Sequence, residues 1–134
     1  MTATDRWATL RAVVRWALAA LMIGAGTAHF TAHEEFLGQT PAFLPYRSVI
    51  VWVTGVIEIA LGVLLVAAPR WRRQVGWALA VFLVLIFPGN VYQAVAGTDA
   101  FGLDTPTARW VRLAFQPPLI LAALWSSGAL PRER

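Results

Sequence analysis

The sequence contains no cysteine and no lysine, and only 13% of its 134 residues are charged. The lack of cysteine excludes disulfide bonds, thiol catalysis, cysteine-bound zinc and iron–sulfur clusters within this chain. Soluble domains carry about 25% charged residues. Because 58% of this sequence is hydrophobic, its composition is that of a membrane protein. All 11 basic residues are arginines, and they give a net charge of +4.

Four apolar segments each come close to the roughly 20 residues with which an α-helix crosses a bilayer. They cover about residues 16–33, 49–68, 75–96 and 110–130. We expect Pro88 to kink the third segment, and Pro117 and Pro118 to interrupt the fourth. The sequence therefore predicts an all-α fold, an integral membrane four-helix bundle that forms a single domain over residues 1–134. The N-terminal residues do not resemble a cleavable signal sequence, because no small-x-small site ends the first apolar run.

The arginines are unevenly distributed among the connecting segments. If the N-terminus is inside, the inner segments contain Arg6, Arg11, Arg15, Arg70, Arg72, Arg73, Arg132 and Arg134. The outer segments then contain only Arg47, Arg109 and Arg112. Cytoplasmic loops carry the excess of positive charge in membrane proteins. The pattern therefore predicts that the N- and C-termini are both cytoplasmic.

Glu58 lies in the middle of Val49–Ala68, a run with no other charged residue. An ionised carboxylate at this depth costs about 3 kcal/mol by insertion scales, and such groups normally face a protein interior. Helical spacing places Thr54, Glu58 and Gly62 on one stripe, where the small residues allow a neighbouring helix to approach closely.

The other three segments contribute polar residues at a similar depth. His29 belongs to the first segment, Asn90 and Gln93 to the third, and Gln116 to the fourth. We therefore predict a polar pocket in the outer half of the bilayer. Its candidate catalytic residues are Glu58 and His29, and its candidate ligand-pocket residues are Thr54, Asn90, Gln93 and Gln116.

Each of these residues also has a structural interpretation. Thr54, Asn90 and Gln93 are equally suited to interhelical hydrogen bonds, which contribute about 0.6 kcal/mol each. Gln116 is suited to bonding the carbonyl groups that the two following prolines leave without a donor. Glu58 itself is compatible with a buried pair that gives structural specificity.

His29 and His33 are four residues apart, which is a spacing that chelates metals on a helix. The chain has only two histidines, and membrane di-iron or haem enzymes need more ligands, so we expect no metal site. His33, Glu34 and Glu35 are expected in a solvated loop. The longer connection Thr31–Ser48 combines apolar and polar residues, which is typical of a segment that lies in the interface and covers the bundle as a lid.

Four segments of the sequence resemble the DoxX-like family of small four-helix bacterial membrane proteins. They are G-T-A-H-F (Gly26–Phe30), P-A-F-L-P-Y-R (Pro41–Arg47), T-G-V-I-E (Thr54–Glu58) and F-P-G-N-V-Y-Q-A (Phe87–Ala94). The resemblance implies a multi-pass protein of the bacterial cytoplasmic (inner) membrane. Some family members resemble subunits of thiosulfate:quinone oxidoreductases, and others accompany redox or detoxification enzymes.

Three functional hypotheses follow from these observations. The first is a redox-linked, quinone-associated membrane subunit in which a quinone or a lipid occupies the pocket and a redox enzyme is the partner. The second is a non-enzymatic membrane anchor or accessory protein for a partner enzyme, and the third is a proton or small-solute pathway. The expected partners include the lipid bilayer and, as an open alternative, a second copy in a homo-oligomer, but no nucleic acid.

Overall fold

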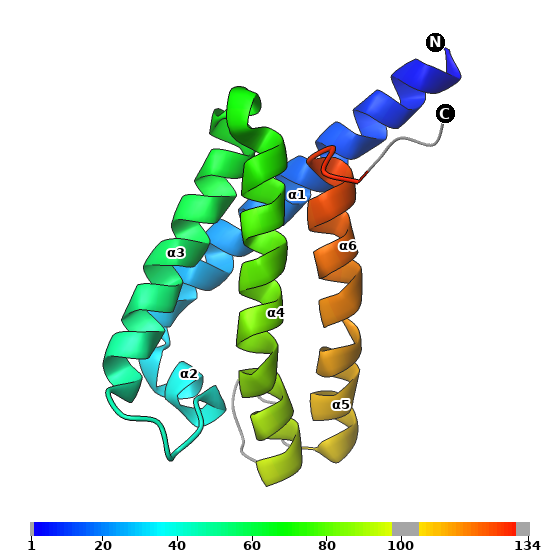
Figure 1. Ribbon diagram of the computed structural model, residues 1–134. Coiled ribbons are helices and arrows are strands. Elements are labelled where there is room, and N and C mark those ends of the chain that lie inside the picture. Colours follow the sequence, from blue (N-terminus) through cyan, green and yellow to red (C-terminus); the bar gives the residue numbers. More distant parts are fainter. Residues whose placement is uncertain (1, 98–104, 131–134) are drawn as a thin grey trace.

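The computed structural model describes residues 2–97 and 105–130, and its regular structure there is entirely helical (Figure 1). The elements are α1 (Ala3–Thr31), α2 (His33–Gln39), α3 (Arg47–Ala67), the short 3-10 helix η1 (Pro69–Trp71), α4 (Arg72–Ala96), α5 (Pro106–Ala114) and α6 (Gln116–Ser126). Within these two described ranges, three segments are long and apolar enough to cross a membrane, namely Ala3–Thr31, Arg47–Ala67 and Pro69–Ala96. The all-helical fold of a membrane protein is therefore as predicted.

The first helix begins well before the expected start at residue 16. Its N-terminus carries a capping box, in which Oγ1 of Thr2 accepts a hydrogen bond from the Asp5 amide (3.2 Å). The Asp5 carboxylate in turn accepts one from the Thr2 amide (3.0 Å). This reciprocal pairing satisfies two backbone donors at the helix start. The N-terminal end of α1 projects beyond the end of α6 (Figure 1), and Trp7 contacts Trp125 of α6 edge to face (6.2 Å between ring centroids).

The fourth apolar segment is interrupted close to its two prolines. It forms two helices, α5 and α6, which lie end to end beside α4 (Figure 1). The break is at Phe115, and Pro117 and Pro118 lie in the first turn of α6. Proline is tolerated in a first turn because its missing N–H has no helical acceptor there. The two prolines therefore start α6, and the fourth apolar segment is interrupted directly before them, close to where the sequence predicted.

Glycines bring the helices into close contact. A Cβ atom added to Gly26 of α1 would lie 2.8 Å from the carbonyl oxygen of Gly55 in α3. One added to Gly62 would lie 3.0 Å from the carbonyl oxygen of Ala19. Between α4 and α6, the equivalent contact is between Gly76 and the side chain of Ser127. Small residues at these positions allow close backbone packing, as predicted for the stripe on α3.

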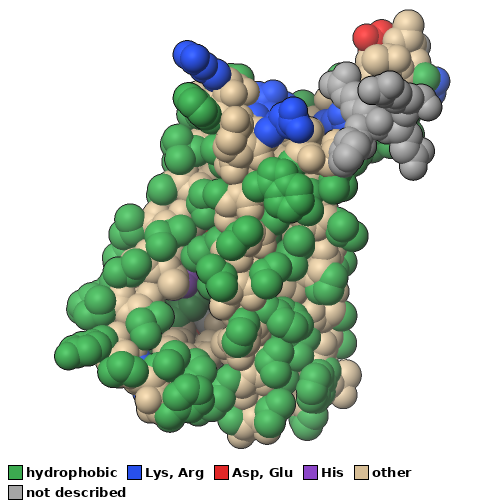
Figure 2. Space-filling view, in the orientation of Figure 1, with side chains coloured by type: hydrophobic (Ala, Val, Ile, Leu, Met, Phe, Trp, Pro, Cys, Tyr) green, Lys and Arg blue, Asp and Glu red, His purple; other side chains and the backbone are tan. Residues whose placement is uncertain are grey.

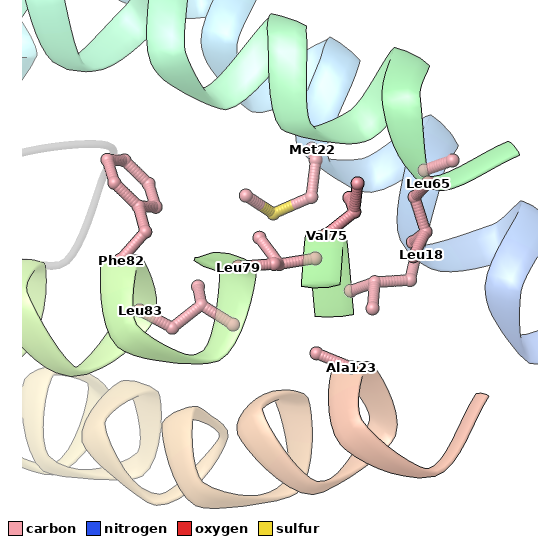
Figure 3. Packing of buried hydrophobic residues seen from close by; sticks show 9 residues of the cluster. Leu18, Met22, Leu65, Val75, Leu79, Phe82, Leu83 and Ala123 are labelled. Atoms are coloured by element: carbon pink, nitrogen blue, oxygen red, sulfur yellow. The ribbon is translucent and has the colours of Figure 1, made fainter. Parts of the chain in front are cut away.

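The two ends of the molecule are different. We call the half that contains η1 and the N-terminus of α4 the turn half, and the opposite half, which contains α2, the loop half. The hydrophobic core fills the turn half (Figure 3). It consists of Leu18, Ala19, Met22, Leu65, Val75, Leu79, Phe82, Leu83 and Ala123. The loop half contains the candidate site.

Candidate functional site: a cavity in the loop half

A cavity of about 520 Å³ occupies the loop half. All the long helices contribute to its wall, and α2 and the following loop contribute Phe36, Gln39, Thr40, Pro41 and Leu44. Figure 2 shows the hollow opening between α3 and α4, on a lateral surface that is mainly hydrophobic. Most of the lining is apolar. A lateral opening of this kind faces the acyl chains when the helices stand in a bilayer.

Glu58 and His29 lie next to each other in the cavity wall. Their side chains are 7% and 10% exposed, and Oε2 of Glu58 is 3.3 Å from Nδ1 of His29. The same ring nitrogen lies 2.9 Å from the carbonyl oxygen of Ala25. Oε2 of Glu58 makes no hydrogen bond with any residue in the described part of the chain. A buried carboxylate oxygen without such a bond is energetically costly, and is typical of a site that binds something else.

The position of His29 is set by two residues that contact it in the fold, Gly55 and Phe36. Gly55 lies one turn before Glu58, and a Cβ atom at this position would be 2.6 Å from Cβ of His29. The glycine therefore makes room for the imidazole beside α3. Phe36 of α2 stacks on the other side of the ring, with centroids 3.7 Å apart and an angle of 22° between the planes. These two contacts hold the imidazole beside the carboxylate of Glu58.

Arg112 also lines the cavity, and the sequence analysis assigned it only to the outer charge balance. It projects from α5, and its Nη1 donates to Oε1 of Gln93 (3.2 Å). The amide of Gln39 contacts the guanidinium of Arg112, in the orientation in which its oxygen accepts a hydrogen bond from Nη2 (3.1 Å). The guanidinium attracts the carboxylate of Glu58 electrostatically. Arg112 could have been identified as a pocket residue from the amphipathic spacing of the short segment Pro106–Ala114.

The remaining predicted pocket residues occupy different positions. Thr54, Asn90 and Gln116 line the cavity, whereas Gln93 does not line it but supports Arg112 and Gln39. The hydroxyl of Thr54 donates to backbone oxygens of its own helix, at Ile50 (2.8 Å) and Val51 (3.0 Å).

Gln116 bonds a backbone carbonyl, as the sequence suggested, but the carbonyl belongs to a different helix. Its Nε2 donates to the carbonyl oxygen of Leu83 in α4 (2.9 Å). The expected acceptors were carbonyl groups on its own segment, before the two prolines. Leu83 is next to Val84, whose carbonyl has no helical donor because Pro88 lacks an N–H. The bond therefore ties α6 to the proline-containing part of α4.

The segment after α1 forms a helix instead of the expected loop. His33 begins α2, and its ring stacks on Trp52 of α3 with centroids 5.0 Å apart, while Nε2 lies 3.1 Å from the Ser48 hydroxyl. Arg47 holds the end of α2 by donating to the carbonyl oxygens of Leu37 and Thr40. His33 and His29 thus contact different groups. Since Gln39 and Leu44 line the cavity, this segment covers it in the way expected of a lid.

The fold and the cavity define a helical membrane protein with a laterally open site. A family model described as a domain of unknown function (DUF8561) matches residues 18–127, and the chain belongs to this family. The match covers α1 from Leu18 onward, the helices α2 to α6 and every residue of the cavity wall named above. No curated protein and no solved structure matches the chain.

Proposed function

We propose that the protein is a redox-linked membrane subunit that binds a quinone-like amphiphile in the cavity of the loop half. In this proposal, a partner redox enzyme supplies two electrons and the quinone takes up two protons to become a quinol. Glu58 and His29 carry these protons next to the ring carbonyl. The resemblance to DoxX-like proteins, some of which look like quinone-linked subunits, is consistent with this proposal and remains a prediction.

The observation that carries the proposal is the position of Glu58. Its carboxylate is buried, adjacent to His29 and without a hydrogen-bond partner at Oε2 among the described residues. It also faces a mainly apolar cavity that opens sideways (Figure 2). A carboxyl and an imidazole side by side are typical of proton transfer. Intramembrane acids usually mark such functional sites.

The proposed membrane arrangement is a four-helix bundle in which α5 and α6 together form the fourth span. Both termini lie on the cytoplasmic side of a bacterial inner membrane. The N-terminus of α1, η1 and the C-terminus of α6 lie at the same end of the molecule (Figure 1). Arg70, Arg72 and Arg73 are located at that end too, which agrees with the positive-inside rule.

Binding of a decyl-substituted benzoquinone to the protein in lipid nanodiscs tests the function. We expect Glu58→Gln to weaken binding about tenfold or more, because an amide is a weaker hydrogen-bond donor to the ring carbonyl than a protonated carboxyl group. Native mass spectrometry of the same sample reports the bound quinone and any partner chain. Glu34→Gln is the matched control, since Glu34 is exposed on α2. Equal affinity in the Glu58 and Glu34 variants would contradict the proposal.

A further inference from the structure

Arg112 places a permanent positive charge at the wall of an otherwise mainly apolar cavity. Its guanidinium bonds Gln93 and contacts Gln39, so two buried amides from different helices fix its position. A guanidinium presents five N–H donors in a planar fork that matches the oxygens of carbonyl and oxyanion groups. An arginine held in this way at a cavity wall is suited to binding an oxygen of the ligand.

The opening of the cavity indicates where the ligand comes from. It lies between α3 and α4 on the side of the molecule (Figure 2). The surrounding surface of these two helices carries exposed apolar side chains, among them Val53, Val56, Val81, Val84 and Leu85. In a bilayer these side chains contact acyl chains. A ligand that enters here arrives from the membrane, with its polar head inside and its apolar tail in the opening.

We infer that the cavity binds an amphiphile of the bilayer whose head carries an electron-rich oxygen, either a carbonyl or an oxyanion, and that Arg112 is the residue that selects this head. The inference rests on the cavity that the proposed function assigns as the ligand site, and it names the head group by which the ligand is recognised. The carboxylate of Glu58 faces the same cavity and disfavours a negatively charged head group, whereas the guanidinium of Arg112 favours such a head group. Quinones supply the carbonyl form of this chemistry and fatty acids supply the oxyanion form.

Three probes with similar tails distinguish the two sources in nanodiscs: a decyl-substituted benzoquinone, dodecanoate and dodecane. The apparent dissociation constant of each probe is measured by native mass spectrometry on wild type and variants. We expect Arg112→Gln to weaken binding of the oxygen-bearing probes about 10- to 100-fold, the effect of losing a charge-assisted hydrogen bond in a buried site. Dodecane binding is expected to stay the same, because it lacks the head.

Two further variants separate this role from a structural one. Arg112→Lys keeps the charge but loses the planar fork, so we expect an intermediate loss of affinity with an unchanged melting temperature. Arg112→Lys also keeps the inference testable if Arg112→Gln does not fold. Arg73→Gln removes an exposed arginine at the turn half and is expected to leave binding unchanged.

The outcomes also separate this inference from the proposed function. If the Arg112 variants bind quinone normally while Glu58→Gln does not, the inference is overturned and the proposed function stands. If wild type binds dodecanoate but not quinone, with a loss in Arg112→Gln, the inference is supported and the quinone proposal fails. Equal affinity of wild type for dodecane and for both oxygen-bearing probes overturns the inference, since the head is then not recognised.

Discussion

The turn half and the loop half are built from the same long helices, yet side chains fill the turn half and a cavity occupies the loop half. In the turn half, Leu65, Leu79 and Ala123 are completely buried in a cluster of apolar side chains (Figure 3). In the loop half, α2 covers a cavity lined by an acid, an imidazole and a guanidinium. Helix association in membranes depends mainly on van der Waals packing. The turn half therefore holds the helices together, while the loop half is free to bind a ligand.

The largest effect on the free energy of unfolding is expected when a core side chain of the turn half is truncated. Leu79→Ala should lower the free energy of unfolding by about 2–4 kcal/mol, because it leaves a cavity in close-packed surroundings. Unfolding by sodium dodecyl sulfate in mixed micelles, followed by circular dichroism, measures this change. Leu121→Ala is the control, since Leu121 is 59% exposed, and it should cost less than about 0.5 kcal/mol. Similar losses for both variants would mean that the turn half is not the stabilising half.

A smaller effect is expected where α1 and α3 meet, between the two halves. A Cβ atom at Gly26 would lie 2.8 Å from a backbone oxygen of α3, so Gly26→Ala must push the helices apart. We expect a cost of about 1–3 kcal/mol, as for overpacked cores, and weaker quinone binding because His29 moves away from Glu58. Gly24→Ala is the matched control on the same helix, because a Cβ atom there meets no neighbour within 4 Å. If both variants retain wild-type stability and binding, the close contact between α1 and α3 does not hold His29 beside Glu58.

The smallest effect is expected inside the cavity wall, at Thr54. Its hydroxyl bonds to Ile50 and Val51 of its own helix, so Thr54→Val should change the free energy of unfolding by less than about 0.6 kcal/mol. Quinone affinity should change by no more than about twofold. Thr27→Val on α1 removes the same kind of bond at an exposed position and serves as the control. A tenfold loss of affinity in Thr54→Val alone would show that this hydroxyl turns toward the ligand.

Much of the fold was predictable because it depends on properties that are local in the sequence. Apolar length indicates the long helices, and a single acid in an apolar run indicates that Glu58 faces away from lipid. Helical spacing also identified the stripe of small residues around Glu58 that receives α1. The start of α1 was missed although its capping box is local, because the apolar run was used to define the helix.

The residues that were missed or misplaced depend on neighbours that are distant in the sequence. Arg112 and Gln39 meet at the cavity although they are far apart in the chain. His33, Glu34 and Glu35 were expected in a solvated loop, and they begin the helix α2, whose first residue stacks on Trp52. The seven residues of α2 contain no periodicity from which the contact between His33 and Trp52 could be predicted. The interruption of the fourth segment at Pro117 and Pro118 was predicted, but not that the two prolines form the first turn of a new helix, α6.

The sequence by itself determined that this is a helical membrane protein and that an acid lies within its apolar part, because burial in lipid requires long apolar helices whatever their arrangement. Only the tertiary structure decided which polar groups meet. The approach of α1 to α3 brings His29 to Glu58, and α5 carries Arg112 to the same cavity. The physical reason is that contacts between helices depend on how side chains pack across the interface, which the order of residues along one helix does not specify.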